Sequence, residues 1–127
     1  MKALIIDDER LARKELIGLL EPHPEVEIIG ECANADEAEK MIADHRPDLV
    51  FLDVQMPGRT GFELLSALDH VPYVIFVTAF DEHAMKAFEV SALDYLLKPV
   101  DAERLAEALK KLPEPFEIDR ASKEVLS

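Results

Sequence analysis

Five short runs of apolar residues alternate along the chain with segments in which apolar residues recur at helical spacing. This alternation is typical of βαβ units, in which parallel strands form one sheet and helices connect them. The sequence therefore predicts an α/β fold built on a five-stranded parallel sheet. The predicted strands are Ala3 to Ile6, Val26 to Ile29, Leu49 to Leu52, Tyr73 to Val77 and Tyr95 to Leu97.

The third and fourth runs lack polar alternation, which indicates strands in the middle of the sheet with helices on both faces. The helical stripes are Ala12, Leu16, Leu19 and Leu20; Ala35, Ala38, Met41 and Ile42; and Leu105, Leu109 and Leu112. Asn34 and Asp101 are predicted N-caps, with Glu37 as the capping partner of Asn34. Residues 81–90 place only three apolar residues on one helical face, Ala84, Ala87 and Phe88. We therefore expect this helix to be the least firmly held.

Composition limits the classes of protein to which the chain can belong. Its 127 residues, 49% of them hydrophobic, suit one domain. The 14 basic against 27 acidic residues argue against nucleic-acid binding by this segment. The lone Cys32 excludes an internal disulfide and a multi-thiolate zinc site.

The sequence contains no segment typical of a membrane protein or a secreted protein. No apolar run approaches the roughly 20 residues that span a bilayer. The apolar start resembles a signal peptide only until Asp7 and Asp8 interrupt it. We expect a soluble cytoplasmic protein.

The helical pattern ends after Leu112, where Pro113 and Pro115 cannot continue a helix. We therefore expect one domain over residues 1–112 and a linker or C-terminal tail over residues 113–127. A terminal strand is the alternative for the tail, because Phe116 and Ile118 alternate with acidic residues.

Charged or hydroxyl side chains directly follow four of the predicted strands. They are Asp7 and Asp8, Asp53, Thr78, and Lys98. Each alone has an ordinary explanation, such as a helix cap or a solvated surface residue. In an open parallel sheet, however, ligands bind beyond the carboxyl ends of the strands. The five together therefore favour a binding site at that edge.

Three carboxylates in one site repel one another unless their pKa values rise or a cation binds. A hard divalent ion such as Mg²⁺ suits oxygen ligands, and Ca²⁺ is a less favoured alternative because no spaced calcium-binding loop is present. The remaining groups suggest phosphoryl transfer. Asp53 could be the nucleophile, Asp7 and Asp8 could hold the metal, and Lys98 and Thr78 could contact phosphoryl oxygens.

Four segments, "LIIDDE", "VFLDVQMPG", "VTAF" and "DYLLKP", resemble the receiver domains of two-component response regulators. The resemblance covers about Met1 to Leu112. It implies a doubly wound, flavodoxin-like sheet with strand order 2-1-3-4-5 and helices on both faces. It also implies that a sensor histidine kinase phosphorylates Asp53 in the presence of Mg²⁺, for which Mn²⁺ can substitute. The protein would then be a signalling switch and not an enzyme.

The resemblance also implies roles for individual residues. Asp8 is expected to be the principal metal carboxylate, with Asp7 as its partner, Asp53 as the phosphoacceptor and a further ligand in the backbone carbonyl of Gln55. Lys98 is expected to pair with the phosphoryl group.

A second set of implied roles concerns switching. Thr78 and Tyr95 are expected to form the switch pair, and the Lys98–Pro99 bond is expected to be cis. Gln55 and Phe80 are expected to tune the lifetime of the phosphoryl group. The turn departs from the family pattern at Arg59-Thr60, where an acidic or amide residue often precedes the glycine.

The segment "VTAFDEHAMKAFEVSALDYLLKP" is similar to the LytTR (LytR/AlgR-like) subgroup, whose receivers usually precede a β-rich DNA-binding domain. This implies transcriptional output through an effector domain that lies outside these residues, with no DNA or membrane contact by this segment. A homodimer is expected through the face of the fourth helix, fifth strand and fifth helix. Its candidate contacts are Phe88, Val90, Lys110 and Lys111.

Other functions are also compatible with the sequence. A stand-alone receiver could act by protein–protein contact, and a degenerate receiver could be a plain binding module, although the complete acidic site argues against degeneracy. A phosphatase with an aspartyl nucleophile would need a second aspartate where Gln55 stands. A flavodoxin-type carrier is disfavoured because no glycine-rich phosphate loop is present.

Overall fold

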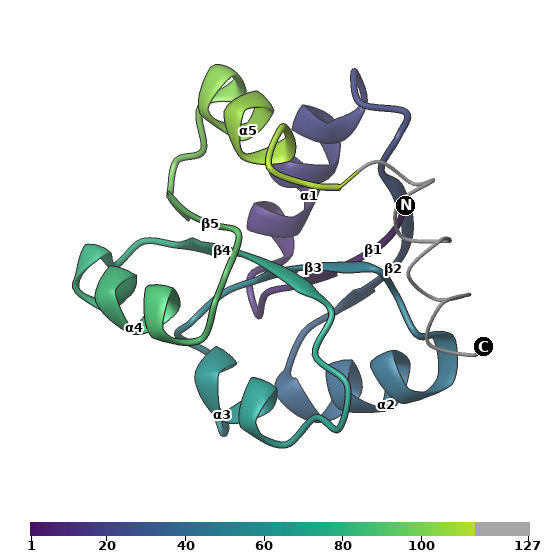
Figure 1. Cartoon of the computed structure of the whole chain (residues 1–127), viewed down its shortest axis with the longest axis vertical. Coiled ribbons are helices and arrows are strands. Elements are labelled where there is room, and N and C mark those ends of the chain that lie inside the picture. The colour runs from purple at the N-terminus through teal and green to yellow at the C-terminus, as the bar shows by residue number, and fades with distance from the viewer. Residues whose placement is uncertain (114–127) are drawn as a thin grey trace.

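The computed structural model describes residues 1–113, and of residues 83, 85 and 88 it describes only the backbone. Five parallel strands form one sheet in the order β2-β1-β3-β4-β5 (Figure 1). The strands are β1 (Lys2–Ile6), β2 (Glu27–Cys32), β3 (Leu49–Leu52), β4 (Tyr73–Thr78) and β5 (Asp94–Leu97). The expected fold class and strand order are confirmed, and β3 and β4 lie inside the sheet as predicted. Apart from Pro113, the predicted tail lies outside the described residues.

Helices cover both faces of the sheet (Figure 1). They are α1 (Arg10–Leu20) and α5 (Ala102–Leu109) on one face, and α2 (Ala35–His45), α3 (Gly61–Ser66) and α4 (Ala84–Glu89) on the other. Ala3 and Ile5 of β1 enter the core beneath α1 and α5, whereas Leu4 and Ile6 enter the core on the opposite face. This two-sided burial explains why the strands appear in the sequence as unbroken apolar runs.

Two predicted caps are present, with one difference in detail. The Asn34 and Asp101 side chains accept hydrogen bonds from the backbone N–H groups of Glu37 and Arg104. The Glu37 carboxylate accepts from the N–H of Ala33 and not from that of Asn34. The Asn34 cap is therefore confirmed, whereas Glu37 binds the backbone of Ala33, one residue before the predicted position.

α3 was absent from the predicted stripes, because its six residues are too few to show a helical repeat. Thr60 and Glu63 form a capping box at its start, with each side chain accepting from the other residue's N–H. The pattern Thr-x-x-Glu before apolar residues is the signal that could have located it. It also explains the unusual Thr60, which supplies the N-cap oxygen at this position.

The segment predicted as one helix over residues 81–90 is divided into a 3-10 turn, η1 (Asp81–His83), and the short α4. Ala87 is buried, but Ala84 is exposed, so the predicted apolar face is narrower than expected. Only the backbone of Phe88 is described, so its predicted place on this face is untested. No helix in the described part of the chain is long and apolar enough to cross a membrane.

The pairing of β1 with β3 brings the ends of these strands level. Ile6 lies opposite Leu52 in the sheet, and the N–H of Asp53 donates to the carbonyl of Ile6 over 3.0 Å. On the other side of β1, the N–H of Asp7 donates to the carbonyl of Cys32 over 3.0 Å. The residues after β1 and β3 therefore meet at one edge of the sheet.

Candidate functional site

Three carboxylates gather where β1 and β3 end. One oxygen from each of Asp7, Asp8 and Asp53 lies within 4.8 Å of the others. Asp7 and Asp53 are only 5% and 4% exposed, whereas Asp8 is open to solvent. The structure thus brings together three predicted residues that are up to 46 positions apart in the sequence, which follows from the parallel pairing of the two strands.

Lys98, directly after β5, contacts two of these carboxylates. Its Nζ lies 2.7 Å from Oδ2 of Asp7 and 3.1 Å from Oδ2 of Asp53. The carboxylate of Glu9 is 3.9 Å away, and this residue was not among the predicted site residues. Its place in the run Asp7-Asp8-Glu9 is the signal that could have found it. The ammonium offsets part of the negative charge of the cluster.

The charges of the cluster act on one another. Burial and the negative charge of Asp7 raise the pKa of Asp53, while the ammonium of Lys98 opposes that rise. Burial works to lower the pKa of Lys98, but its hydrogen bond to Asp7 and the charge of Asp53 outweigh burial and raise that pKa. Lys98 is therefore firmly protonated, and a further cation would favour the ionised form of Asp53.

Asp7 is held at every polar group that it has. Its N–H donates to Cys32, its Oδ1 accepts from the N–H of Glu9 over 2.9 Å, and its Oδ2 contacts Lys98. Its carbonyl oxygen accepts a hydrogen bond of 2.7 Å from Nη1 of Arg13. Arg13 was not predicted, because no pattern in the sequence indicates that α1 brings this guanidinium to the turn after β1.

Thr78, the last residue of β4, is completely buried. Its hydroxyl lies near Asp53 and works to lower the pKa of that carboxyl, although the two groups make no hydrogen bond of standard geometry. Among the described residues, Oγ1 of Thr78 has no hydrogen-bond partner. Because an unpaired buried hydroxyl is costly, this atom is a candidate to donate to a group bound beside Asp53.

The loop after Asp53 is wound closely against it. The N–H of Gln55 donates to Oδ1 of Asp53 over 3.3 Å, so the main chain at Gln55 lies beside the acidic cluster. A Cβ on Gly61 would lie 2.5 Å from the carbonyl oxygen of Asp53, closer than real side chains come. Arg59 ties the loop to α2 through ion pairs of 2.8 Å with Asp36 and 2.7 Å with Glu39.

Of the residues predicted to switch or tune, Gln55 follows β3, whereas Thr78, Phe80 and Tyr95 lie around the end of β4. The half-buried Tyr95 donates a hydrogen bond from its phenol to the carbonyl of Phe80, and its ring packs against Phe76 with 6.0 Å between centroids. Phe80 is itself exposed, and the Lys98–Pro99 peptide bond is cis. The phenol of Tyr95 is therefore attached to the segment that leads into η1.

The donor set of the acidic cluster suits a hard divalent cation. Its members Asp7, Asp8 and Asp53 offer carboxylate oxygens, with no histidine or cysteine in the cluster, and such ligands select Mg²⁺, Mn²⁺ or Ca²⁺ over softer metals. A cation there would relieve the repulsion that raises the pKa of Asp53. The residues present therefore fit a divalent metal site.

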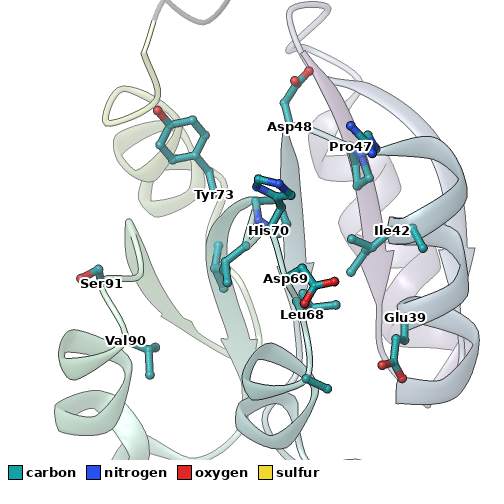
Figure 2. Close-up of a pocket in the computed structure, with 16 residues that line it drawn as sticks. Glu39, Ile42, Pro47, Asp48, Leu68, Asp69, His70, Tyr73, Val90 and Ser91 are labelled. Atoms are coloured by element: carbon teal, nitrogen blue, oxygen red, sulfur yellow. The ribbon is translucent and has the colours of Figure 1, made fainter. Parts of the chain in front are cut away.

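A cavity of about 880 Å³ lies at the opposite end of the sheet (Figure 2). It is lined near the amino ends of β3 and β4, by Asp48 and Tyr73, and by Ile42 of α2 and Val90. None of the predicted site residues lines it. The cavity and the acidic cluster therefore lie at opposite ends of the strands.

Comparison with known families gives one match that covers most of the chain. The family model described as the response regulator receiver domain matches residues 3–110. Among curated proteins, a response regulatory protein of Vibrio cholerae is 54% identical over 114 residues, which cover 88% of this chain and 48% of that protein. The transcriptional regulatory protein BtsR of Escherichia coli is 51% identical over 114 residues, with the same two coverages. The chain spans about half the length of these relatives.

Solved structures agree with this match. The response regulatory domain of mrkE from Klebsiella pneumoniae is 38% identical with a TM-score of 0.80, covering 88% of this chain and 94% of that one. The REC domain of AraT from Geobacillus stearothermophilus is 32% identical with a TM-score of 0.78, covering 94% and 97%. A DNA-binding response regulator of the LuxR family from Staphylococcus aureus is 32% identical with a TM-score of 0.77, covering 87% and 96%.

Proposed function

Since this chain belongs to the response regulator receiver domains of two-component systems, we propose that it accepts a phosphoryl group on Asp53 from a sensor histidine kinase. The observation that carries the proposal is the gathering of Asp7, Asp8 and Asp53 within 4.8 Å, beside the ammonium of Lys98. An ionised carboxylate is already nucleophilic, so the reaction needs no general base.

In the proposed reaction, an oxygen of Asp53 attacks phosphorus, and the phosphorus–nitrogen bond of the donor phosphohistidine breaks. The imidazole nitrogen keeps the electron pair of that bond. Asp7, Asp8, Asp53 and the backbone carbonyl of Gln55 would hold Mg²⁺, or Mn²⁺ in its place. A bound divalent ion supplies neutralisation of the charge on the transferred oxygens.

Lys98 and Thr78 would bind the phosphoryl group once it is attached. The ammonium of Lys98 already lies 3.1 Å from the acceptor carboxylate. The buried hydroxyl of Thr78, which has no hydrogen-bond partner among the described residues, can donate to another phosphoryl oxygen and would then be paired. Both residues would be drawn toward the added negative charge.

A shift of Thr78 toward the phosphoryl group would change the position of Tyr95, whose phenol donates a hydrogen bond to the carbonyl of Phe80 near the surface. The face of α4, β5 and α5 would then change its preference for partners, including a second copy of the chain. Of the expected contacts, Lys110 is exposed, Lys111 pairs with Asp94 over 2.9 Å, and the exposed Val90 lines the cavity at the other end of the sheet.

The side chains of Gln55 and Phe80, both exposed, are proposed to tune the lifetime of the phosphoryl group by controlling access of water. In this role Phe80 would shield the acyl phosphate, because an apolar ring orders no attacking water.

The proposed output is control of transcription. Curated relatives are named transcriptional regulatory proteins and are about twice as long as this chain, since 114 aligned residues make up 48% of them. We propose that the whole protein carries a DNA-binding domain of the LytTR type after the receiver, and that it acts in the cytoplasm. A receiver that acts through protein contacts alone is the alternative.

The test uses a small acyl phosphate as donor, with and without Mg²⁺, and measures the intact mass of the protein. A metal-dependent gain of one phosphoryl group is expected, and Asp53→Asn should abolish it. Asp48→Asn is a matched control, because Asp48 is at the opposite edge of the sheet, where its carboxylate accepts from the N–H of Lys2. Phosphorylation of the Asp53→Asn variant, or none of the wild-type protein, would contradict the proposal.

A further inference from the structure

We propose that Arg13 is a positioning residue that holds the Asp7–Asp8 turn in the geometry that binds a divalent cation. This inference rests on the proposed function, because it concerns the cation site of the acidic cluster. Arg13 lies on α1. Within the described part of the chain, it makes no hydrogen bond to Asp53 or to the carboxylate of Asp7. It would act through the backbone of the turn.

The side chain of Arg13 connects three parts of the fold. Its Nη1 donates to the carbonyl oxygen of Asp7 over 2.7 Å, and its Nε pairs with Oε1 of Glu31 on β2 over 3.1 Å. Only 14% of the side chain is exposed, so the guanidinium is held between α1, the turn after β1 and the edge of the sheet. A planar guanidinium can make both bonds at once, which a lysine ammonium on a flexible stem does less well.

The bond to the Asp7 carbonyl fixes the orientation of the next residue. A peptide unit is planar, so holding the carbonyl of Asp7 also holds the N–H and Cα of Asp8. The Asp8 side chain is exposed, and no hydrogen bond or ion pair with the described part of the chain holds its carboxylate. The position of this ligand therefore depends on its backbone, which Arg13 restrains.

Charge and geometry predict opposite effects at this residue. The positive charge of Arg13 lies close to the turn, and by charge alone it would oppose a cation that binds there. Removal of that charge would then tighten cation binding. If Arg13 acts by positioning, its removal weakens cation binding despite the lost repulsion. The sign of the change thus separates the two roles.

The test measures Mn²⁺ affinity by the electron paramagnetic resonance signal of free Mn²⁺, with Mg²⁺ as competitor. Arg13→Met should weaken Mn²⁺ binding by roughly tenfold, the usual effect of removing a residue that orients a metal ligand. The affinity of Arg13→Lys should fall between those of Arg13→Met and the wild type. Arg10→Met is the matched control, since Arg10 is exposed at the start of the same helix. It should bind Mn²⁺ as tightly as the wild type or more tightly.

Urea unfolding without metal establishes that each variant is folded under the binding conditions. If Arg13→Met does not fold, Arg13→Lys decides, and affinity equal to that of the wild type overturns the role of Arg13. Equal or tighter binding by a folded Arg13→Met overturns it as well and leaves the proposed function standing. No Mn²⁺ or Mg²⁺ binding by the wild type would instead overturn the cation site itself.

Discussion

The phenol of Tyr95 donates a hydrogen bond to the main-chain carbonyl of Phe80. The two residues come from different segments, since Tyr95 lies in β5 and Phe80 precedes η1. This bond joins β5, an edge strand of the sheet, to a short helical segment in which, of the side chains described, only Ala87 is buried. The segment therefore relies on few contacts for its position.

Tyr95→Phe should loosen the segment that leads into α4. The variant keeps the ring packing against Phe76 and loses one hydrogen bond, worth about 1 kcal/mol. Faster amide exchange is expected over residues 79–87, measured by hydrogen exchange and mass spectrometry. Tyr73→Phe is the control, because Tyr73 is exposed at the start of β4, and it should leave exchange in this segment unchanged. Unaltered exchange in Tyr95→Phe would show that the bond does not hold the segment.

Thr78→Val should stabilise the unphosphorylated protein by about 1 kcal/mol. The substitution keeps the shape of the side chain and removes a hydroxyl that is buried without a hydrogen-bond partner. We expect the desolvation cost that disappears to outweigh the support that this hydroxyl gives the ionised form of Asp53. Urea unfolding measures the change. The same substitution at Thr60 should destabilise by about 1 kcal/mol, because it removes the cap of α3. Opposite signs are the expected result, and a loss of stability at both positions would count against an unpaired Thr78.

Gly61→Ala should destabilise the protein by about 1–3 kcal/mol, because the added Cβ meets the backbone oxygen of Asp53, which cannot yield as a flexible side chain would. Gly18→Ala provides the contrast. Gly18 lies inside α1 with nothing within 4 Å of an added Cβ, so alanine there should stabilise by about 0.5–1 kcal/mol. Thermal unfolding of the two variants checks both signs, and a neutral Gly61→Ala would mean that the loop relaxes freely.

Asp94 should contribute stability that depends on pH. Burial works to raise the pKa of Asp94, but hydrogen bonds from Arg104 and Lys111 outweigh burial and lower that pKa to about 2. Since the folded pKa lies below the unfolded value of 3.8, the contribution is present above about pH 5 and is lost as the pH falls through 4 toward 2. Its size is on the order of 1–2 kcal/mol, because the partly exposed Arg104 and Lys111 are screened by solvent.

Urea unfolding of the wild type and Asp94→Asn at several pH values tests this dependence. The difference in unfolding free energy should be greatest near pH 6 and should shrink below pH 4. A difference that stays constant down to pH 3 would mean that the carboxylate's charge is not the cause.

The strands could be located from sequence because burial on both faces leaves unbroken apolar runs. Strand order came from the family resemblance, since apolar runs do not reveal which strands are neighbours. α3 escaped detection because six residues show no repeat, and the division at Ala84 could not be foreseen because an exposed alanine looks the same in sequence as a buried one.

The acidic site was predictable because its residues directly follow strands, and the carboxyl ends of parallel strands meet at one edge. Arg13 and Glu31 were not, since their contacts arise only when α1 and β2 pack against the turn after β1. The closeness of Gly61 to Asp53 likewise depends on the path of a loop, on which periodicity gives no information.

The pairing of Ile6 with Leu52 has a consequence for how such a protein can vary. A slip of one residue between these strands would displace one acidic group by about 3.3 Å and turn alternate side chains to the wrong core. The alternation that buries these strands on both faces therefore also sets the distance between the carboxylates at their ends. Substitutions on the outer surfaces of the helices leave this distance unchanged, so the surface of the protein can vary while the acidic cluster stays the same.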